Sequence, residues 1–232
     1  MSDMRGVTGV STVIRPAGDD DFRMLRLQHD GAAFVTEWEM GLALEGRVYV
    51  ATAGTVTTPI TFGAGTIDTT EPDFDMSVPA STLVIPLEIR VYMETYGTNA
   101  QFECMASVGR LGVLGSTGAT TVTPTNLRMD APFTSTVSIV SNVDASGATY
   151  MTGNVTEFWR AGQQFSITKT TASATAAVDD PNLFIWRRSE SRVAPVLYST
   201  AGITRLNVFA TSQAGSGFIT VIYAELPGSA LA

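Results

Sequence analysis

The stretch that decides the fold class is Leu87-Glu88-Ile89-Arg90-Val91-Tyr92-Met93-Glu94. Apolar residues occupy every second position, and charged or polar residues fill the positions between them. Because successive side chains of a β-strand point to opposite faces of its sheet, this period of two predicts an antiparallel strand that is buried on one face only. A second alternating run, 102–108, follows the turn residues Tyr96-Gly97-Thr98-Asn99. We expect the two runs to pair as neighbouring strands.

Further strand-like segments, rich in β-branched residues and separated by Gly, Pro, Asn and Asp, lie on both sides of this pair. The expected strands are 47–52, 56–62, 136–143, 154–160, 164–169, 183–188, 196–200, 204–211 and 217–226. Roughly eight to ten short strands without alternating helices are typical of a sandwich or barrel. We predict an all-β protein, an antiparallel jelly-roll sandwich over residues 46–232 with an extended N-terminal arm over residues 1–45.

The N-terminal arm has a different composition. It begins rich in Gly, Ser and Thr, and the acidic run Asp19-Asp20-Asp21 is followed by Phe22-Arg23-Met24-Leu25-Arg26-Leu27. Residues 32–40 fit either a short helix, with Phe34 and Trp38 on one side, or a strand.

Composition limits the functional classes. The net charge of −8 argues against a nucleic-acid partner, which requires a basic surface. No apolar run approaches the ~20 residues of a membrane helix, and no secretory signal is visible, so we expect a protein without a membrane partner. A mean hydropathy of +0.17 with 16% charged residues is high for a chain without a membrane span. We therefore expect surplus apolar surface to lie against other subunits.

Few residues suggest catalysis. His29 is the only histidine, so a two-histidine metal site is excluded, and Cys104 lies in the apolar phase of its strand, where a thiol acts as a small hydrophobe. The acidic loop with Asp68, Glu71, Asp73 and Asp75 has the oxygen ligands that Ca²⁺ uses, without EF-hand spacing; a solvated turn is the preferred interpretation. We predict no enzyme activity, no cofactor and no metal. Arg187-Arg188 and Arg192 are expected to meet carboxylates of a neighbouring subunit.

The segment 217–226 carries apolar residues on both faces, so a partner should cover its outer face. Trimer formation would supply that cover, and the chain's own arm is the alternative. Adjacent aromatic residues at Phe158-Trp159 and Phe184-Ile185-Trp186 should place one ring of each group outward, where aromatics anchor interfaces. The residues predicted at interfaces are Phe22, Arg23, Arg26, Phe34, Trp38, Trp159, Trp186, Ile219, Val221 and Tyr223.

Two stretches resemble structural proteins of tailed bacteriophages in their Thr/Ala/Gly-rich strands and scarcity of lysine. They are Gly153-Asn154-Val155-Thr156-Glu157-Phe158-Trp159-Arg160-Ala161-Gly162-Gln163-Gln164-Phe165, continuing to Trp186, and 212–227. The resemblance implies a jelly-roll head decoration (cement) protein on the capsid surface of the virion, synthesised in the host cytoplasm. Such a protein is often trimeric and clamps neighbouring copies of the major capsid protein. The arm would then reach the shell or an adjacent trimer.

Other functions stay open. A receptor- or carbohydrate-binding jelly-roll module of a tail or fibre would use Tyr96 or Trp159 as a stacking platform. A hydrolase would use the acidic loop, and a small-virus capsid protein would normally have a more strongly basic arm.

Overall fold

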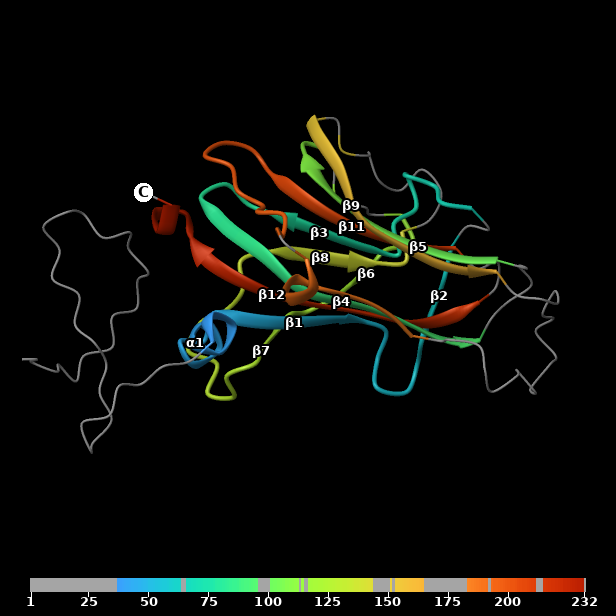
Figure 1. Ribbon diagram of the computed structural model, residues 1–232, viewed down its shortest axis with the longest axis horizontal. Helices are drawn as coiled ribbons and strands as arrows, with labels where there is room; N and C mark the ends of the chain where they lie inside the picture. The colour runs from blue at the N-terminus through green and yellow to red at the C-terminus, as the bar shows by residue number, and fades with distance from the viewer. Residues whose placement is uncertain are drawn as a thin grey trace, which may run out of the picture.

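A computed structural model describes residues 37–63, 66–95, 101–112, 114, 117–143, 151, 153–164, 183–191, 193–211 and 215–231. Within these residues the chain forms two antiparallel β-sheets packed face to face, with a short helix beside them (Figure 1). The predicted all-β sandwich is confirmed. No helix in the described part of the chain is long and apolar enough to cross a membrane.

The first sheet, named sheet 1, has the strand order β10-β4-β12-β1-β7, and β2 pairs with β12. Its strands are β1 (Val48–Ala53), β2 (Ile60–Thr61), β4 (Thr82–Thr95), β7 (Thr125–Asn126), β10 (Leu183–Arg187) and β12 (Ser216–Pro227). Sheet 2 has the order β6-β8-β3-β11-β5-β9. Its strands are β3 (Phe74–Val78), β5 (Gln101–Arg110), β6 (Thr120–Thr121), β8 (Ser138–Ser141), β9 (Gly153–Gln164) and β11 (Thr204–Thr211). The helical elements are α1 (Trp38–Leu44), η1 (Arg188–Glu190) and η2 (Gly228–Leu231).

The longer strands pair in a nested order. The first, β1, pairs with the last, β12; moving inward, β3 pairs with β11, β4 with β10, and β5 with β9. The expectation that 87–94 and 102–108 pair with each other is wrong, because β4 lies in sheet 1 and β5 in sheet 2. The apolar sides of β4 and β5 instead face one core from opposite sheets. Within that core Phe102 of β5 contacts Phe184 of β10, the strand that pairs with β4, with ring centroids 4.9 Å apart.

The core lies between the inner faces of the sheets. On β4 the predicted alternation is confirmed from Ile89 to Met93, whose apolar members are at most 2% exposed. Leu87 departs from it. The β4–β12 register shifts between Ile222 and Tyr223, and Leu87 packs on the outer side of sheet 1, the side away from sheet 2.

A smaller apolar cluster lies on that outer side. Leu42 of α1 is buried against Val48, Ala224 and Leu226, so the helix covers one end of sheet 1. Of the two alternatives for 32–40, a short helix or a strand, the described residues form the helix, which begins at Trp38; residues before 37 lie outside the described part. The predicted boundary at residue 45 thus falls after a helix that already packs on the sandwich.

Of three other predicted strands, two are shorter than expected and one lies outside the described residues. In 56–62 only Ile60–Thr61 pairs, as β2. The segment 196–200 contributes a single bridge, from Leu197 to Val84. Beyond residue 164, the segment 164–169 lies outside the described residues.

Candidate functional site

Four predicted interface residues lie in the interior. Trp186 is 6% exposed, and Ile219, Val221 and Tyr223 are 0% exposed. The register sets Ile219 opposite Val91 and Val221 opposite Ile89, so these side chains point between the sheets. Their prediction as outward-facing contacts is wrong, because a strand that is apolar on both faces does not itself indicate which face is inner.

The other predicted interface residues differ in their surroundings. Trp159 is half-buried and packs against the core, so its ring is not an open stacking platform. Trp38 is 40% exposed, and the Arg188 guanidinium lies 5.1 Å from its ring centroid. The remaining predicted interface residues lie outside the described part of the chain; they are Phe22, Arg23, Arg26 and Phe34. His29 and Tyr96 also lie outside it.

Sheet 1 leaves a band of large apolar side chains partly exposed on its outer side. On β4 and β12, the rings of Tyr92 and Phe218 stack with centroids 6.3 Å apart. Next to them on β10, Leu183 is 44% exposed, and at the far end Met40 of α1 is 56% exposed. We name this band the outer apolar face; its members are Met40, Leu87, Tyr92, Leu127, Leu183, Ile185, Phe218 and Ile222.

A groove of about 340 Å³ lies within this face, between α1 and sheet 1. Its apolar wall includes Met40, Leu87 and Ile222, and Glu37 and Glu88 are among its polar lining. Its volume falls in the range of small-molecule pockets, but it opens onto a surface that is apolar beyond its rim.

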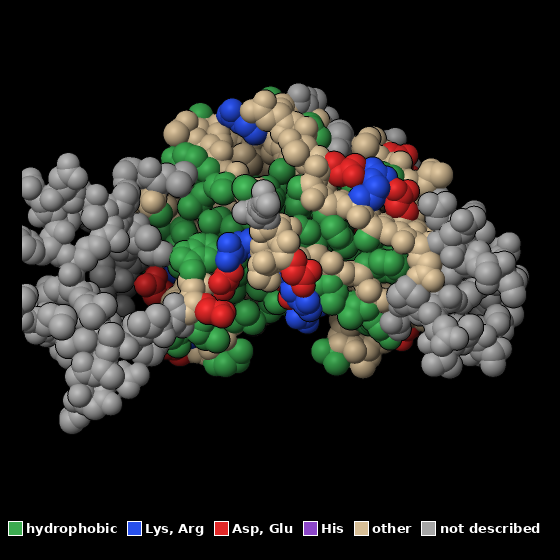
Figure 2. Space-filling view, in the orientation of Figure 1, with side chains coloured by type: hydrophobic (Ala, Val, Ile, Leu, Met, Phe, Trp, Pro, Cys, Tyr) green, Lys and Arg blue, Asp and Glu red, His purple; other side chains and the backbone are tan. Residues whose placement is uncertain are grey.

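Charged side chains on the outer side of sheet 1 pair with one another. Arg187 donates to Glu88 at 3.1 Å and to Glu190 at 3.0 Å, and Glu88 also pairs with Arg90. The Nε of Arg188 donates to Glu39 of α1 at 2.7 Å. Figure 2 shows hydrophobic side chains over much of the visible face, with acidic and basic groups side by side in small clusters. Arg187 and Arg188, expected to meet carboxylates of a neighbouring subunit, thus already have carboxylate partners within the chain, and Arg192 lies outside the described residues.

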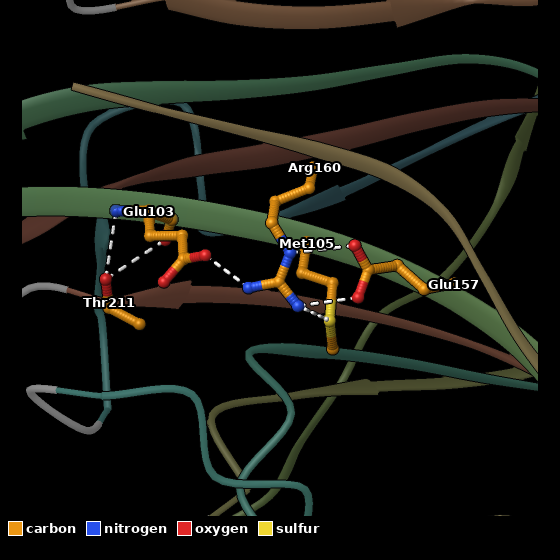
Figure 3. Close-up of polar contacts among 5 residues, drawn as sticks. All are labelled: Glu103, Met105, Glu157, Arg160 and Thr211. Carbon is orange, nitrogen blue, oxygen red and sulfur yellow. Dashed lines mark hydrogen bonds and ion pairs between the residues drawn. The ribbon is translucent and has the colours of Figure 1, made fainter.

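Sheet 2 carries a different charged cluster on its outer side (Figure 3). Arg160 of β9 lies between Glu157 and Glu103, and its Nε donates to Glu157 at 2.7 Å. Its Nη2 also lies 3.1 Å from the sulfur of Met105. The hydrogen bonds that Arg160 donates to Glu157 and Glu103 raise the pKa of its guanidinium above its usual range. Two carboxylates against one guanidinium leave this cluster with a net negative charge.

A buried ion pair lies nearer the middle of sheet 2. Arg205 of β11 and Asp75 of β3 are both 0% exposed, and the Nε of Arg205 donates to Asp75 at 3.1 Å. Asn207 donates to the same carboxylate at 2.9 Å. Because Leu206 and Val208 face the core, these polar groups lie on the outer side of the sheet.

The acidic loop does not behave as one solvated turn. Asp68 is exposed and accepts hydrogen bonds from Thr70, but Asp75 is buried, as is Asp73. Asp73 accepts from the backbone N–H of Gly63 at 2.9 Å and of Ala210 at 2.7 Å, and burial raises its pKa to about 7. Among the described residues, no three His, Cys, Asp or Glu side chains converge as a metal site would require.

Two further features bear on chemistry. Cys104 is 0% exposed, as its strand phase predicted, and burial raises the pKa of its thiol to about 12. Glu225, which sequence reasoning missed, accepts from the hydroxyls of Ser135 at 2.6 Å and Thr136 at 2.7 Å. Ser135 also hydrogen-bonds the Tyr223 hydroxyl, whose pKa is raised above its usual range by burial. The sequence signal that could have identified Glu225 is a carboxylate within an otherwise apolar strand. The hydrogen bonds of Glu225 and Tyr223 connect β12 to the segment that precedes β8.

A second hollow of about 380 Å³ lies between the β1–β2 turn and strands β6 and β8. Threonines make up half of its described lining, which holds no titratable side chain.

No family model matches the chain, and no match was found among curated proteins or solved structures.

Proposed function

We propose that this protein is a structural subunit of a virus particle, a jelly-roll decoration or cement protein that forms homotrimers on the capsid and stabilises contacts between major capsid subunits. The observation that carries the proposal is the outer apolar face. Monomeric soluble proteins rarely leave so many large apolar side chains exposed together, whereas proteins that function by packing require such a surface.

The strand order supports the jelly-roll part of the proposal. The nested pairs are β1 with β12, β3 with β11, β4 with β10 and β5 with β9. A long antiparallel hairpin that rolls up into two sheets has this order of pairs. Jelly rolls are double-sheet sandwiches found in viral capsid and lectin domains. Fold alone does not set function, so the surface carries the rest of the argument.

A cement protein functions through buried area. Interfaces on the order of 1,000 Å² or more separate specific association from incidental contact. At about 25 cal/mol per Å² of apolar area, even part of such an interface supplies several kcal/mol per contact. The outer apolar face offers this kind of surface, and the net charge of −8 suits a protein partner better than nucleic acid.

Two measurements test the proposal. Light scattering on the full-length protein should give three times the 24.6 kDa mass of one chain. Quantitative mass spectrometry of purified particles of the virus that encodes the chain should find it at a fixed copy number in multiples of three. A monodisperse single-chain species, together with absence from purified particles, would contradict the proposal.

A further inference from the structure

We propose that the second hollow, between the β1–β2 turn and strands β6 and β8, binds an uncharged ligand rich in hydroxyl groups, of the chemical class of a neutral sugar. Its lining combines six threonines, one serine and one asparagine with four residues whose side chains carry no polar group. The proposal goes beyond the proposed function, because it requires neither a capsid nor a second copy of the chain.

The hollow lies at the edge of the sandwich where the chain passes from one sheet to the other. The short segment 122–124 joins β6 of sheet 2 to β7 of sheet 1. On β1, the partners of β7 are Tyr49 and Val50, and the lining of the hollow begins beyond them, at Thr52. Strands of both sheets therefore form the walls, so the hollow is built into the fold, as ligand pockets usually are.

The phase of the strands directs polar side chains toward the interior at this edge. Thr120 of β6 pairs with Ser141 of β8, and the N–H of Val122 donates to the carbonyl of Ile139 at 3.0 Å. Val122 and Ile139 belong to the buried core, and residues two apart along a strand share a face. Thr120 and Ser141 thus lie on the inner side of sheet 2, where the apolar core gives way to hydroxyl groups.

The chemistry of the lining favours an uncharged ligand. None of the lining residues is titratable, so an ion that left water would find no opposite charge in the hollow. The hydroxyl of serine or threonine both donates and accepts hydrogen bonds, as each hydroxyl of a sugar does. Thr52 hydrogen-bonds Thr220 at 3.1 Å, and among the described residues no side-chain hydrogen bond joins the other hydroxyls of the hollow. These hydroxyls can therefore pair with those of a ligand.

Apolar side chains supply a second feature that suits a sugar. Ile60 and Val122 line the hollow and are only 6% and 9% exposed. A sugar ring carries C–H groups between its hydroxyls, and apolar contact removes these groups from water. The volume of about 380 Å³ lies at the lower end of the range for small-molecule pockets, which suits one or two sugar rings better than a polymer.

Asn142, directly after β8, gives the most direct indication of a ligand. Its Oδ1 atom is buried and has no hydrogen-bond partner in the described part of the chain. Its backbone is fixed, because its N–H donates to the carbonyl of Asp73 at 3.3 Å, and its φ of 55° lies in the left-handed region that asparagine tolerates. Buried polar side-chain atoms mostly have a hydrogen-bond partner. A rotation of the Asn142 amide toward the hollow would give it a ligand hydroxyl as that partner.

Saturation-transfer difference NMR on the full-length protein tests the proposal with D-glucose, D-galactose, D-mannose and N-acetyl-D-glucosamine. At least one of these neutral sugars should bind with a dissociation constant on the order of 1 mM. The charged analogues D-glucosamine and D-glucuronate should bind at least about tenfold more weakly than that sugar, because the hollow offers no opposite charge. D-glucosamine is the sharper control, since the net charge of −8 attracts a cation non-specifically. Binding of none of the neutral sugars, or equally tight binding of D-glucosamine, would overturn the proposal and leave the Asn142 amide to solvent.

Two substitutions locate the binding in the hollow. Thr120→Val removes one hydroxyl at nearly constant size, and Asn142→Gly removes the amide but keeps the left-handed backbone accessible. Each should weaken binding of the sugar by about threefold to tenfold, the effect of one lost hydrogen bond. The matched control is Thr156→Val at an exposed threonine of β9, the opposite edge strand of sheet 2, which should bind the sugar as wild type does.

Circular dichroism and thermal unfolding show whether each variant still folds. If folded Thr120→Val and Asn142→Gly keep the wild-type affinity, or Thr156→Val loses as much affinity as they do, the sugar binds elsewhere and the inference fails. These results are independent of the chain mass and the copy number that test the proposed function, so either proposal can fail without the other.

Discussion

The outer sides of the two sheets differ in what they bury: sheet 2 buries a polar ion pair, whereas sheet 1 leaves large apolar side chains exposed. On sheet 2, the ion pair between Arg205 and Asp75 is 0% exposed, and every residue of β11 is buried. On sheet 1, large apolar side chains such as Leu183 and Met40 remain about half exposed, and the arginines around them lie at the surface. In an isolated domain the reverse distribution would be more stable. The contrast teaches that the buried polar groups of sheet 2 are satisfied within the chain, whereas the large apolar side chains of sheet 1 stay exposed in the single chain, and the proposed function rests on that exposure.

The largest effect should come from breaking the buried pair. Arg205→Met leaves the Asp75 carboxylate buried without its cation, and removal of one partner of a buried pair costs about 3–5 kcal/mol. Urea unfolding followed by fluorescence measures the loss. The matched control is Arg160→Met at the exposed cluster, which should cost less than about 1 kcal/mol. Equal losses from the two substitutions would show that the burial contrast between these ion pairs has no energetic consequence.

Two isoleucines on one strand sharpen the comparison within sheet 1. Ile219 faces the core and Ile222 faces outward. Ile219→Ala should lower the free energy of unfolding by about 2–5 kcal/mol, and Ile222→Ala by about 1 kcal/mol in the separated chain, because a partly buried side chain loses less burial. Only the cost of Ile222→Ala should grow with protein concentration, since self-association would bury that residue further. A concentration-independent cost at both positions would contradict this.

The most gradual effect is the pH dependence from Asp73, which immediately precedes β3 of sheet 2. Its pKa in the folded protein is raised to about 7 from an ordinary 3.8. The stabilisation from this protonated carboxyl is therefore complete below about pH 4 and lost as the pH rises through about 7. The stability of wild type relative to Asp73→Asn should fall across that window by at most about 1.4 kcal/mol per pH unit, because one proton is involved. Chemical denaturation at a series of pH values measures it, and a flat difference would mean that Asp73 titrates normally.

Sequence reasoning reached the fold class because its signal is local. The alternation from Ile89 to Met93 identifies a half-buried strand wherever that strand pairs, and the same phase placed Cys104 in the core. It did not find the strand partners, because β4 and β5 pair with segments far away in the chain. For the candidate surface it selected the right strand, β12, and the wrong face, since Phe218 and Ile222 look as apolar as Ile219 and Val221 until a second sheet defines the inside.

By itself, then, the sequence determined that this chain is a β-sandwich with surplus apolar surface, because strand period and composition are properties of neighbouring residues and of the whole chain. Only the tertiary structure decided which apolar side chains are exposed and which charged side chains form ion pairs. Asp75 and Arg205 are 130 positions apart, and Glu39 and Arg188 are 149 apart. No local pattern encodes such pairs; they form only when nested strand pairing brings distant segments together, and the same pairing leaves the outer apolar face open.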